Sequence, residues 1–128
     1  MTTSLILRIV YALCLLAGAW THLGILAAHG LRWDYGGVPG FTRVFWTSLT
    51  FLDPLAAILL FLKPRVGLAM TAAIITTDVT HNVWFYAHVG LPLRGYLNWM
   101  FVSQVAFLLF VFLTIRIAWR GLSRPSRL

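Results

Sequence analysis

Apolar residues fall into four long runs along the chain, separated by short segments rich in glycine, proline and charged residues. The runs are Ser4–Ala28, Val44–Leu62, Val66–Val89 and Tyr96–Trp119. A helix needs roughly 20 mainly apolar residues to cross the ~30 Å hydrocarbon core of a bilayer, and each run has about that length. The strict polar–apolar alternation of a membrane β-strand is absent. The pattern therefore predicts an all-α protein with four transmembrane helices, built as one integral membrane domain over residues 1–128.

The connections between the runs have the composition of loops and turns. The longest is His29–Arg43, and the other two are Lys63–Arg65 and Gly90–Gly95. Glycine and proline in these segments mark turns that end one helix and begin the next. Because short connections place consecutive helices antiparallel, we expect an up–down–up–down bundle.

Composition and charge narrow the class of protein. Hydrophobic residues make up 60% of the chain and charged residues 10%, with a formal net charge of +7. The positive residues lie at the ends of the apolar runs, where they meet anionic lipid headgroups, and do not form the basic and aromatic patch of a nucleic-acid interface. The single cysteine, Cys14, cannot form an internal disulfide, which excludes dithiol redox chemistry.

The positive residues also predict which way the helices cross the membrane. Arg32, Arg43 and Arg94 fall on one side. Seven fall on the other: Arg8, Lys63, Arg65, Arg116, Arg120, Arg124 and Arg127. The side with more positive residues faces the cytoplasm, so both termini are expected there. We therefore expect a multi-pass protein of the cell inner (plasma) membrane.

Two acidic residues lie deep inside apolar runs and are the sharpest sign of function. The chain has only three acids, and two of them, Asp53 and Asp78, are near the middle of their runs. An ionisable side chain at that depth costs at least ~2.5 kcal/mol on insertion scales, so it indicates a functional site. In the third run Asp78, His81 and Asn82 stand at i, i+3 and i+4, a spacing that predicts one shared helix face.

Polar side chains from all four runs are expected at similar depth, in the outer half of the bundle. Polar groups inside a bilayer must find partners within the protein. The sequence therefore predicts one intramembrane pocket with polar and aromatic walls. Its polar residues are His22, Asp53, Asp78, His81, Asn82 and Gln104, and its aromatic ligand-binding residues are Trp20, Trp46 and Phe85. Because the buried formal charges are negative, we expect a small, lipophilic ligand that is neutral or cationic.

Short segments in each run match a known membrane-protein family. They are Trp20–Leu23, Ser48–Leu55, Thr80–Asn82 and Val102–Val105. With an acid on the second helix and histidines on the first and third, the chain resembles the EXPERA group, which includes the emopamil-binding sterol isomerases and the sigma-2 receptor. The resemblance implies an intramembrane cavity for sterols or lipophilic amines, where carboxylates stabilise a cation. This sequence has Asp where that family often has Glu, and it has the additional acid Asp78.

The function expected from these residues is binding of a small lipophilic, non-anionic molecule, without a cofactor. As an enzyme the protein would transform that molecule by acid–base chemistry such as isomerisation; whether it is an enzyme stays open. Asp53 and Asp78 would then be the acid–base and charge-stabilising groups, and His81 would relay a proton. Asn82 and Gln104 would orient the substrate. The expected partners are a lipophilic small molecule or lipid and the bilayer, with no nucleic acid; a homodimer is compatible with this prediction.

Three other functions stay open at the level of the sequence. A b-type haem or metal protein would use two histidine pairs at i and i+7, ~10.5 Å apart along each helix: His22 with His29, and His81 with His88. A small multidrug-type transporter would exchange protons for cations through a membrane carboxylate, although the first run has no acid. A structural subunit would use the same polar side chains to hold helices together.

Overall fold

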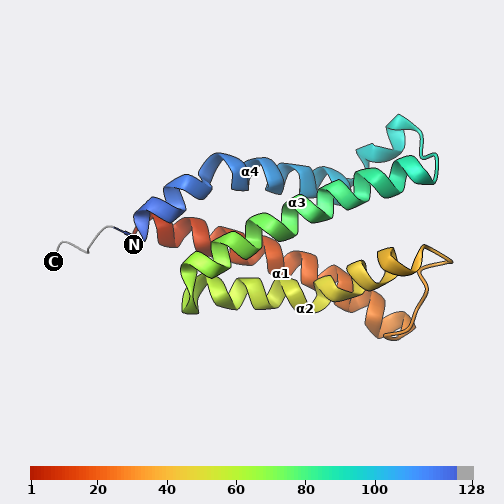
Figure 1. Cartoon of the computed structure of the whole chain (residues 1–128), viewed down its shortest axis with the longest axis horizontal. Coiled ribbons are helices and arrows are strands. Elements are labelled where there is room, and N and C mark those ends of the chain that lie inside the picture. The colour runs from red at the N-terminus through yellow and green to blue at the C-terminus, as the bar shows by residue number, and fades with distance from the viewer. Residues whose placement is uncertain (124–128) are drawn as a thin grey trace.

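The protein is a bundle of four α-helices, described for residues 1–123 by a computed structural model. The helices α1 (Thr3–His29), α2 (Gly40–Leu62), α3 (Pro64–His88) and α4 (Trp99–Gly121) run alternately in opposite directions along one long axis (Figure 1). A short 3₁₀ helix, η1 (Leu93–Leu97), precedes α4, and no strand occurs in the described chain. α1 and α3 each pack against both α2 and α4. The predicted all-α, four-helix architecture is confirmed.

Local chemistry explains where the helices begin and end. Thr2 caps α1 by accepting a hydrogen bond from the Leu5 N–H, and Asn98 caps α4 by accepting one from the Phe101 N–H. These side chains satisfy N–H groups that have no partner within the first turn. α2 begins four residues before the predicted Val44, directly after Pro39. The prediction placed the start of α2 at Val44, where the second apolar run begins, and so missed the turn before it. Helices often begin at or just after a proline, because a proline inside a helix removes a backbone hydrogen bond.

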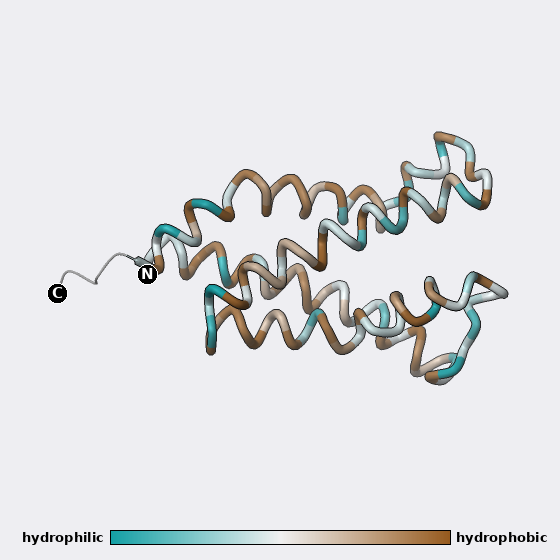
Figure 2. Tube along the Cα trace, viewed as in Figure 1, coloured by the Kyte–Doolittle hydropathy of each residue, from teal (hydrophilic) through white to brown (hydrophobic). Residues whose placement is uncertain are grey.

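Three of the four helices are long and apolar enough to cross a membrane. They are α1, α2 and α4. α3 has the length, 25 residues, but its lower hydropathy keeps it out of this group. The hydropathy trace shows why, because polar positions recur along the half of α3 that contains Asp78 and Asn82 (Figure 2). By length and composition, the predicted membrane spans therefore hold for three helices.

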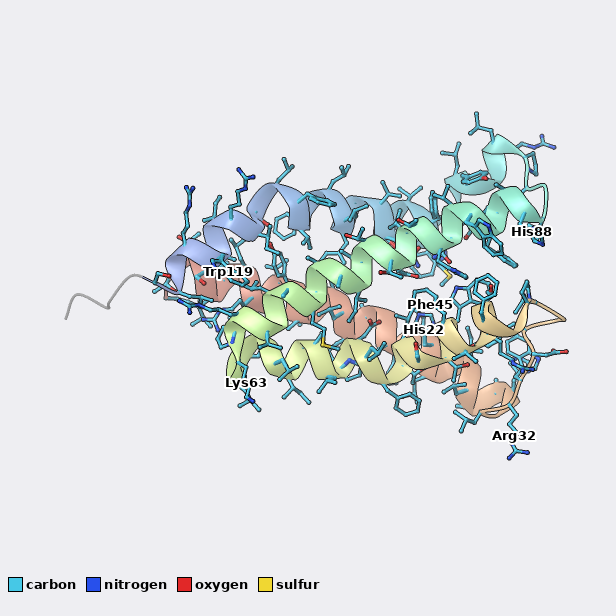
Figure 3. The ribbon with its side chains drawn as sticks, in the orientation of Figure 1. His22, Arg32, Phe45, Lys63, His88 and Trp119 are labelled. Carbon is cyan, nitrogen blue, oxygen red and sulfur yellow. The ribbon has the colours of Figure 1, made fainter. Side chains whose placement is uncertain are left out.

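The two ends of the bundle differ, and we name them by what they carry. The termini end holds the N-terminus, the α2–α3 turn and the last turn of α4; the loop end holds residues 30–39 and 89–98 (Figure 1). Lys63 and Arg32 lie at opposite ends (Figure 3), as the two predicted groups of positive residues require. Arg124 and Arg127, counted in the larger group, lie outside the described residues.

The termini end is closed by contacts between α1 and α4. The Ser4 hydroxyl donates to the Ala118 carbonyl at 2.7 Å. Tyr11 is fully buried, its hydroxyl is 2.7 Å from the Thr114 hydroxyl, and its ring packs edge-on against Phe107 and Phe110. These contacts seal the α1–α4 seam from the first turns of α1 to Tyr11.

The α2–α3 turn at the same end is held by a positive side chain and a glycine. The Leu60 carbonyl would bond to the N–H four residues later, but that residue is Pro64, which has none. Arg8 Nη1 supplies the missing donor at 2.8 Å, and a cation suits the negative end of a helix. Gly67 lets α3 approach closely, because a Cβ there would overlap the backbone of Leu59 and Leu60.

Candidate functional site

A cavity of about 310 Å³ lies inside the bundle, where the sealed part of the α1–α4 seam ends. Phe107 forms its floor, since it packs on Tyr11 from one side and lines the cavity on the other. α1 and α4 supply most of the wall, while α2 contributes Asp53 and α3 contributes Asp78 with two isoleucines. The position of the cavity, toward the loop end, agrees with the depth expected for the pocket.

The α1 wall consists of one helix face with a glycine at its centre. Cys14, Gly18 and His22 follow each other at intervals of four residues and all line the cavity. A Cβ at Gly18 would lie 3.1 Å from Asp53 Oδ2, so the glycine gives the carboxyl room against α1. His22 lies inside the bundle (Figure 3), and its Nδ1 is covered without a hydrogen-bond partner among residues 1–123.

Asp53 and Asp78 face this cavity in different states of hydrogen bonding. Asp53 is 5% exposed and Asp78 is 8% exposed. Asp78 Oδ1 accepts a hydrogen bond from Asn82 Nδ2 at 3.1 Å. Asp53 Oδ1 is covered and has no partner in the described chain. No lysine or arginine of residues 1–123 lines the cavity, so neither carboxyl has a cationic partner there.

A chain of hydrogen bonds joins three helices beside the cavity. Trp46 Nε1 on α2 donates to Asn82 Oδ1 at 3.1 Å. Asn82 Nδ2 on α3 donates both to Asp78 Oδ1 and, at 2.9 Å, to Gln104 Oε1 on α4. Asn82 and Trp46 do not line the cavity themselves, but they hold two residues that do. The predicted meeting of Asp78, Asn82 and Gln104 therefore occurs, with Asn82 at its centre.

His81 lies in a different environment, which we call the aromatic cluster: Phe41, Phe45, Trp46, Trp84 and His81. The four aromatic rings surround the imidazole at centroid distances between 4.8 and 6.1 Å. Phe45 reaches toward α3 from α2 (Figure 3). The His81 ring stands edge-on to Phe41 and Trp46. The structure thus separates His81 from the cavity, although Asp78 is only three residues away.

The remaining predicted residues are also spread over several places. Trp20 is 74% exposed on the outside of α1, and Phe85 packs edge-on against Trp46. His29 stacks on Trp33 at 3.8 Å and His88 on Trp84 at 5.1 Å. Of the four histidines of the haem or metal alternative, His22 lines the cavity and His29 stacks on Trp33, while His81 and His88 both contact Trp84. Within residues 1–123, no group of three or more His, Cys, Asp or Glu side chains is arranged to hold a metal ion.

Several cavity residues were missed by reasoning from polar side chains. They are chiefly Cys14, Gly18, Trp99, Met100 and Phe107. A signal for part of this set was present in the sequence, because Cys14 and Gly18 stand eight and four residues before His22 and must share its face.

Comparison with known proteins gives no match. No protein-family model fits the chain, and no curated protein and no solved structure is significantly similar to it. Function must therefore be argued from the cavity and its residues.

Proposed function

We propose that the chain is a multi-pass protein of the cell inner (plasma) membrane in which all four helices cross the bilayer, with both termini in the cytoplasm. Three helices have the required length and apolar composition. α3, at 25 residues, is about 37 Å long and so exceeds the hydrocarbon core. Its buried polar residues Asp78 and Asn82 bond within the bundle, the condition for polar groups at membrane depth. The charge difference between the two ends supports the orientation.

In this membrane the cavity binds a small lipophilic molecule that is neutral or positively charged. The observation that carries the proposal is Asp53: its carboxyl is almost fully buried at the cavity wall, and neither oxygen makes a hydrogen bond in the described chain. Oδ1 is covered, whereas Oδ2 is not fully covered and lies beside Gly18 of the cavity wall. A buried acceptor without a donor costs about 1–3 kcal/mol, and a bound molecule that donates a hydrogen bond removes that cost. An ammonium group fits best, since no cation of residues 1–123 lines the cavity.

Size and wall chemistry support the same class of ligand. A volume of about 310 Å³ is at the lower end of the range for small-molecule sites. Isoleucines and Phe107 give apolar contact, and the polar groups are few. The resemblance to the EXPERA group, with an acid on the second helix, favours the same ligand class.

An enzymatic form of this proposal assigns proton transfer to Asp53 and Asp78. Two carboxyls on one cavity, one with a free oxygen and one held by Asn82, give groups in unlike environments, as acid–base catalysis requires. We assign no proton relay to His81, because the aromatic cluster keeps it away from the cavity wall.

Binding of two matched probes to the purified protein in lipid nanodiscs tests the proposal. N,N-dimethylphenethylamine is an apolar cation at neutral pH, and 3-phenylpropionate is an anion of similar size. We expect the amine to bind and the anion not to bind, because the buried formal charges are negative. Asp53→Asn should weaken amine binding at least tenfold, since a hydrogen bond to a charged group contributes about 1.5–3 kcal/mol. Isothermal titration calorimetry gives both affinities.

The third aspartate supplies the control. Asp34 lies in the exposed loop, where its Oδ1 accepts from the Gly36 N–H, so Asp34→Asn removes the same charge far from the cavity. It should leave amine binding unchanged. Equal losses in Asp34→Asn and Asp53→Asn, or no binding of the amine to the wild type, would contradict the proposal. Mass spectrometry of lipophilic molecules that co-purify with the protein identifies the natural ligand.

A further inference from the structure

The direction of the hydrogen bonds beside the cavity is fixed at Asn82, which has a donor, Trp46, on one side and an acceptor, Asp78, on the other. An indole N–H can only donate, so the atom of Asn82 that faces Trp46 must be its carbonyl oxygen. The Asn82 amide nitrogen then points the other way. Its two N–H groups are used by Asp78 Oδ1 and Gln104 Oε1. Trp46 fixes the orientation of this amide from outside the cavity, and Asp78 supports the same orientation from the cavity wall.

The orientation of the Gln104 side-chain amide is fixed in the same way. Its oxygen is engaged by Asn82, so its amide nitrogen is the group that stays free. Nε2 makes no hydrogen bond to residues 1–123, and it is not among the fully covered polar atoms that lack a partner. Gln104 lines the cavity. Its N–H groups are therefore unengaged donors on a residue of the cavity wall.

The cavity thus combines a free donor with a free acceptor. Gln104 offers an N–H group from α4, and Asp53 offers Oδ2, the carboxyl oxygen that is not fully covered, from α2. A ligand that matches both must carry an acceptor oxygen and a cationic or N–H donor on one small apolar frame. We infer that Gln104 is a specificity-determining residue: the cavity selects lipophilic amines that also carry a carbonyl oxygen over the same amines without it, and Trp46 is a positioning residue that supports this preference. The inference rests on the proposed function.

One measurement on the wild-type protein tests the donor directly. Gln104 is the only glutamine in the chain, so selective ¹⁵N labelling of glutamine gives a single side-chain amide signal. The two probes are 2-(dimethylamino)acetophenone, which carries the carbonyl, and N,N-dimethylphenethylamine, which does not. We expect the amino ketone to shift a Gln104 amide proton downfield and the plain amine to leave it nearly unchanged. Binding of the amino ketone without that shift would overturn the inference.

Affinity ratios test the role of each residue. The wild type should prefer the amino ketone to the plain amine about tenfold, the value of one hydrogen bond of about 1.4 kcal/mol. Gln104→Leu removes the donor, and the ratio should fall to about one while the plain amine still binds. Trp46→Phe removes one of the two contacts that orient Asn82 and leaves the contact with Asp78, so the Gln104 amide is held less firmly; the ratio should fall part of the way although no cavity residue has changed. Trp84→Phe is the matched control in the aromatic cluster and should keep the wild-type ratio.

The outcomes distinguish a failure of this inference from a failure of the proposed function. If both probes bind, depend on Asp53 and show equal affinity for the wild type, the inference fails and the proposed function stands. A ratio that persists in Gln104→Leu overturns the assignment of Gln104. A ratio that persists in Trp46→Phe, or falls equally in Trp84→Phe, overturns the assignment of Trp46. If neither probe binds, or if Asp53→Asn has no effect on either, the proposed function itself fails.

Discussion

The two ends of the bundle differ in how completely their buried polar groups are paired. At the termini end, side chains that cross between helices reach a partner: Ser4 bonds to Ala118, Tyr11 to Thr114 and Arg8, through Nη1, to Leu60, although Arg8 Nε has no partner in the described chain. Toward the loop end, Asp53 Oδ1 and His22 Nδ1 are covered without a partner in the described chain, beside a cavity. Hydrogen bonds and close packing at one end hold the helices together, and this allows the other end to keep polar groups unpaired. The difference predicts opposite responses to mutation.

The largest effect is expected where the helices approach most closely. Gly67→Ala places a methyl group on the backbone of Leu59 and Leu60, which cannot move aside as a side chain can. We expect a loss of about 3 kcal/mol in the free energy of unfolding, the upper part of the range for overpacking. Unfolding in mixed micelles measures it. Gly24→Ala is the control, because a Cβ there meets nothing within 4 Å; a loss of similar size in Gly24→Ala would show that helix glycines matter for reasons other than contact.

Replacing the two cavity acids by leucine should change the free energy of unfolding in opposite directions. Asp53→Leu replaces a buried carboxyl that has an unpartnered oxygen, so we expect the free energy of unfolding to rise by about 1–2 kcal/mol while amine binding is lost. Asp78→Leu should lower it by a similar amount, because an Asn82 N–H loses its acceptor. The same unfolding assay compares the two. Destabilisation by both variants would mean that Asp53 has a structural role after all.

Removal of a single hydroxyl at the termini end should have an intermediate effect on stability. Tyr11→Phe keeps the ring against Phe107 but removes the hydrogen bond to Thr114. Unfolding should become easier by about 1 kcal/mol, the usual net value of a hydrogen bond. Tyr96→Phe is matched, since the Tyr96 hydroxyl has no side-chain hydrogen bond within residues 1–123 and its ring also packs on an aromatic neighbour. The comparison fails if the two variants lose equal stability.

The smallest effect is expected in the aromatic cluster. His81→Phe places a ring of similar size among Phe41, Phe45 and Trp84, so stability should change by no more than about 0.5 kcal/mol. Binding of the amine probe should not change, because His81 does not line the cavity. His22→Phe, in contrast, alters the cavity wall and should weaken binding in the same titration. A loss of binding in His81→Phe would place His81 functionally with the cavity.

The sequence predicted the helices and the depth of the polar residues better than it predicted their neighbours. Run lengths located all four helices, and the similar depth expected for the polar side chains included Gln104 and Asn82, which are in contact. The i, i+3, i+4 rule put Asp78, His81 and Asn82 on one face, but His81 and Asn82 differ by about 100° around the helix axis. A face that wide can meet two neighbours. Asn82 turns to α4 and His81 to the aromatic residues of α2.

Which neighbour each side meets depends on the arrangement of the helices around the bundle, and short connections do not reveal it. For the same reason, the sequence did not predict which residues form the cavity wall. Polar residues marked α2 and α3, whereas most of the wall comes from α1 and α4. There the lining side chains are largely small or apolar, such as Gly18 and Phe107, and they resemble any other membrane-facing residue in a hydropathy pattern.

The bond between Arg8 and Leu60 has a consequence for the order of assembly. Arg8 belongs to the earliest synthesised of the four helices, whereas its acceptor is freed only by Pro64, more than fifty residues later. In the proposed membrane arrangement, α1 therefore carries a guanidinium near the stretch that crosses the bilayer without its final partner until that part of the chain has been made, an unfavourable state. The α2–α3 hairpin supplies the exposed carbonyl when it forms. Insertion of the first helix to its final position is thus completed by the second and third.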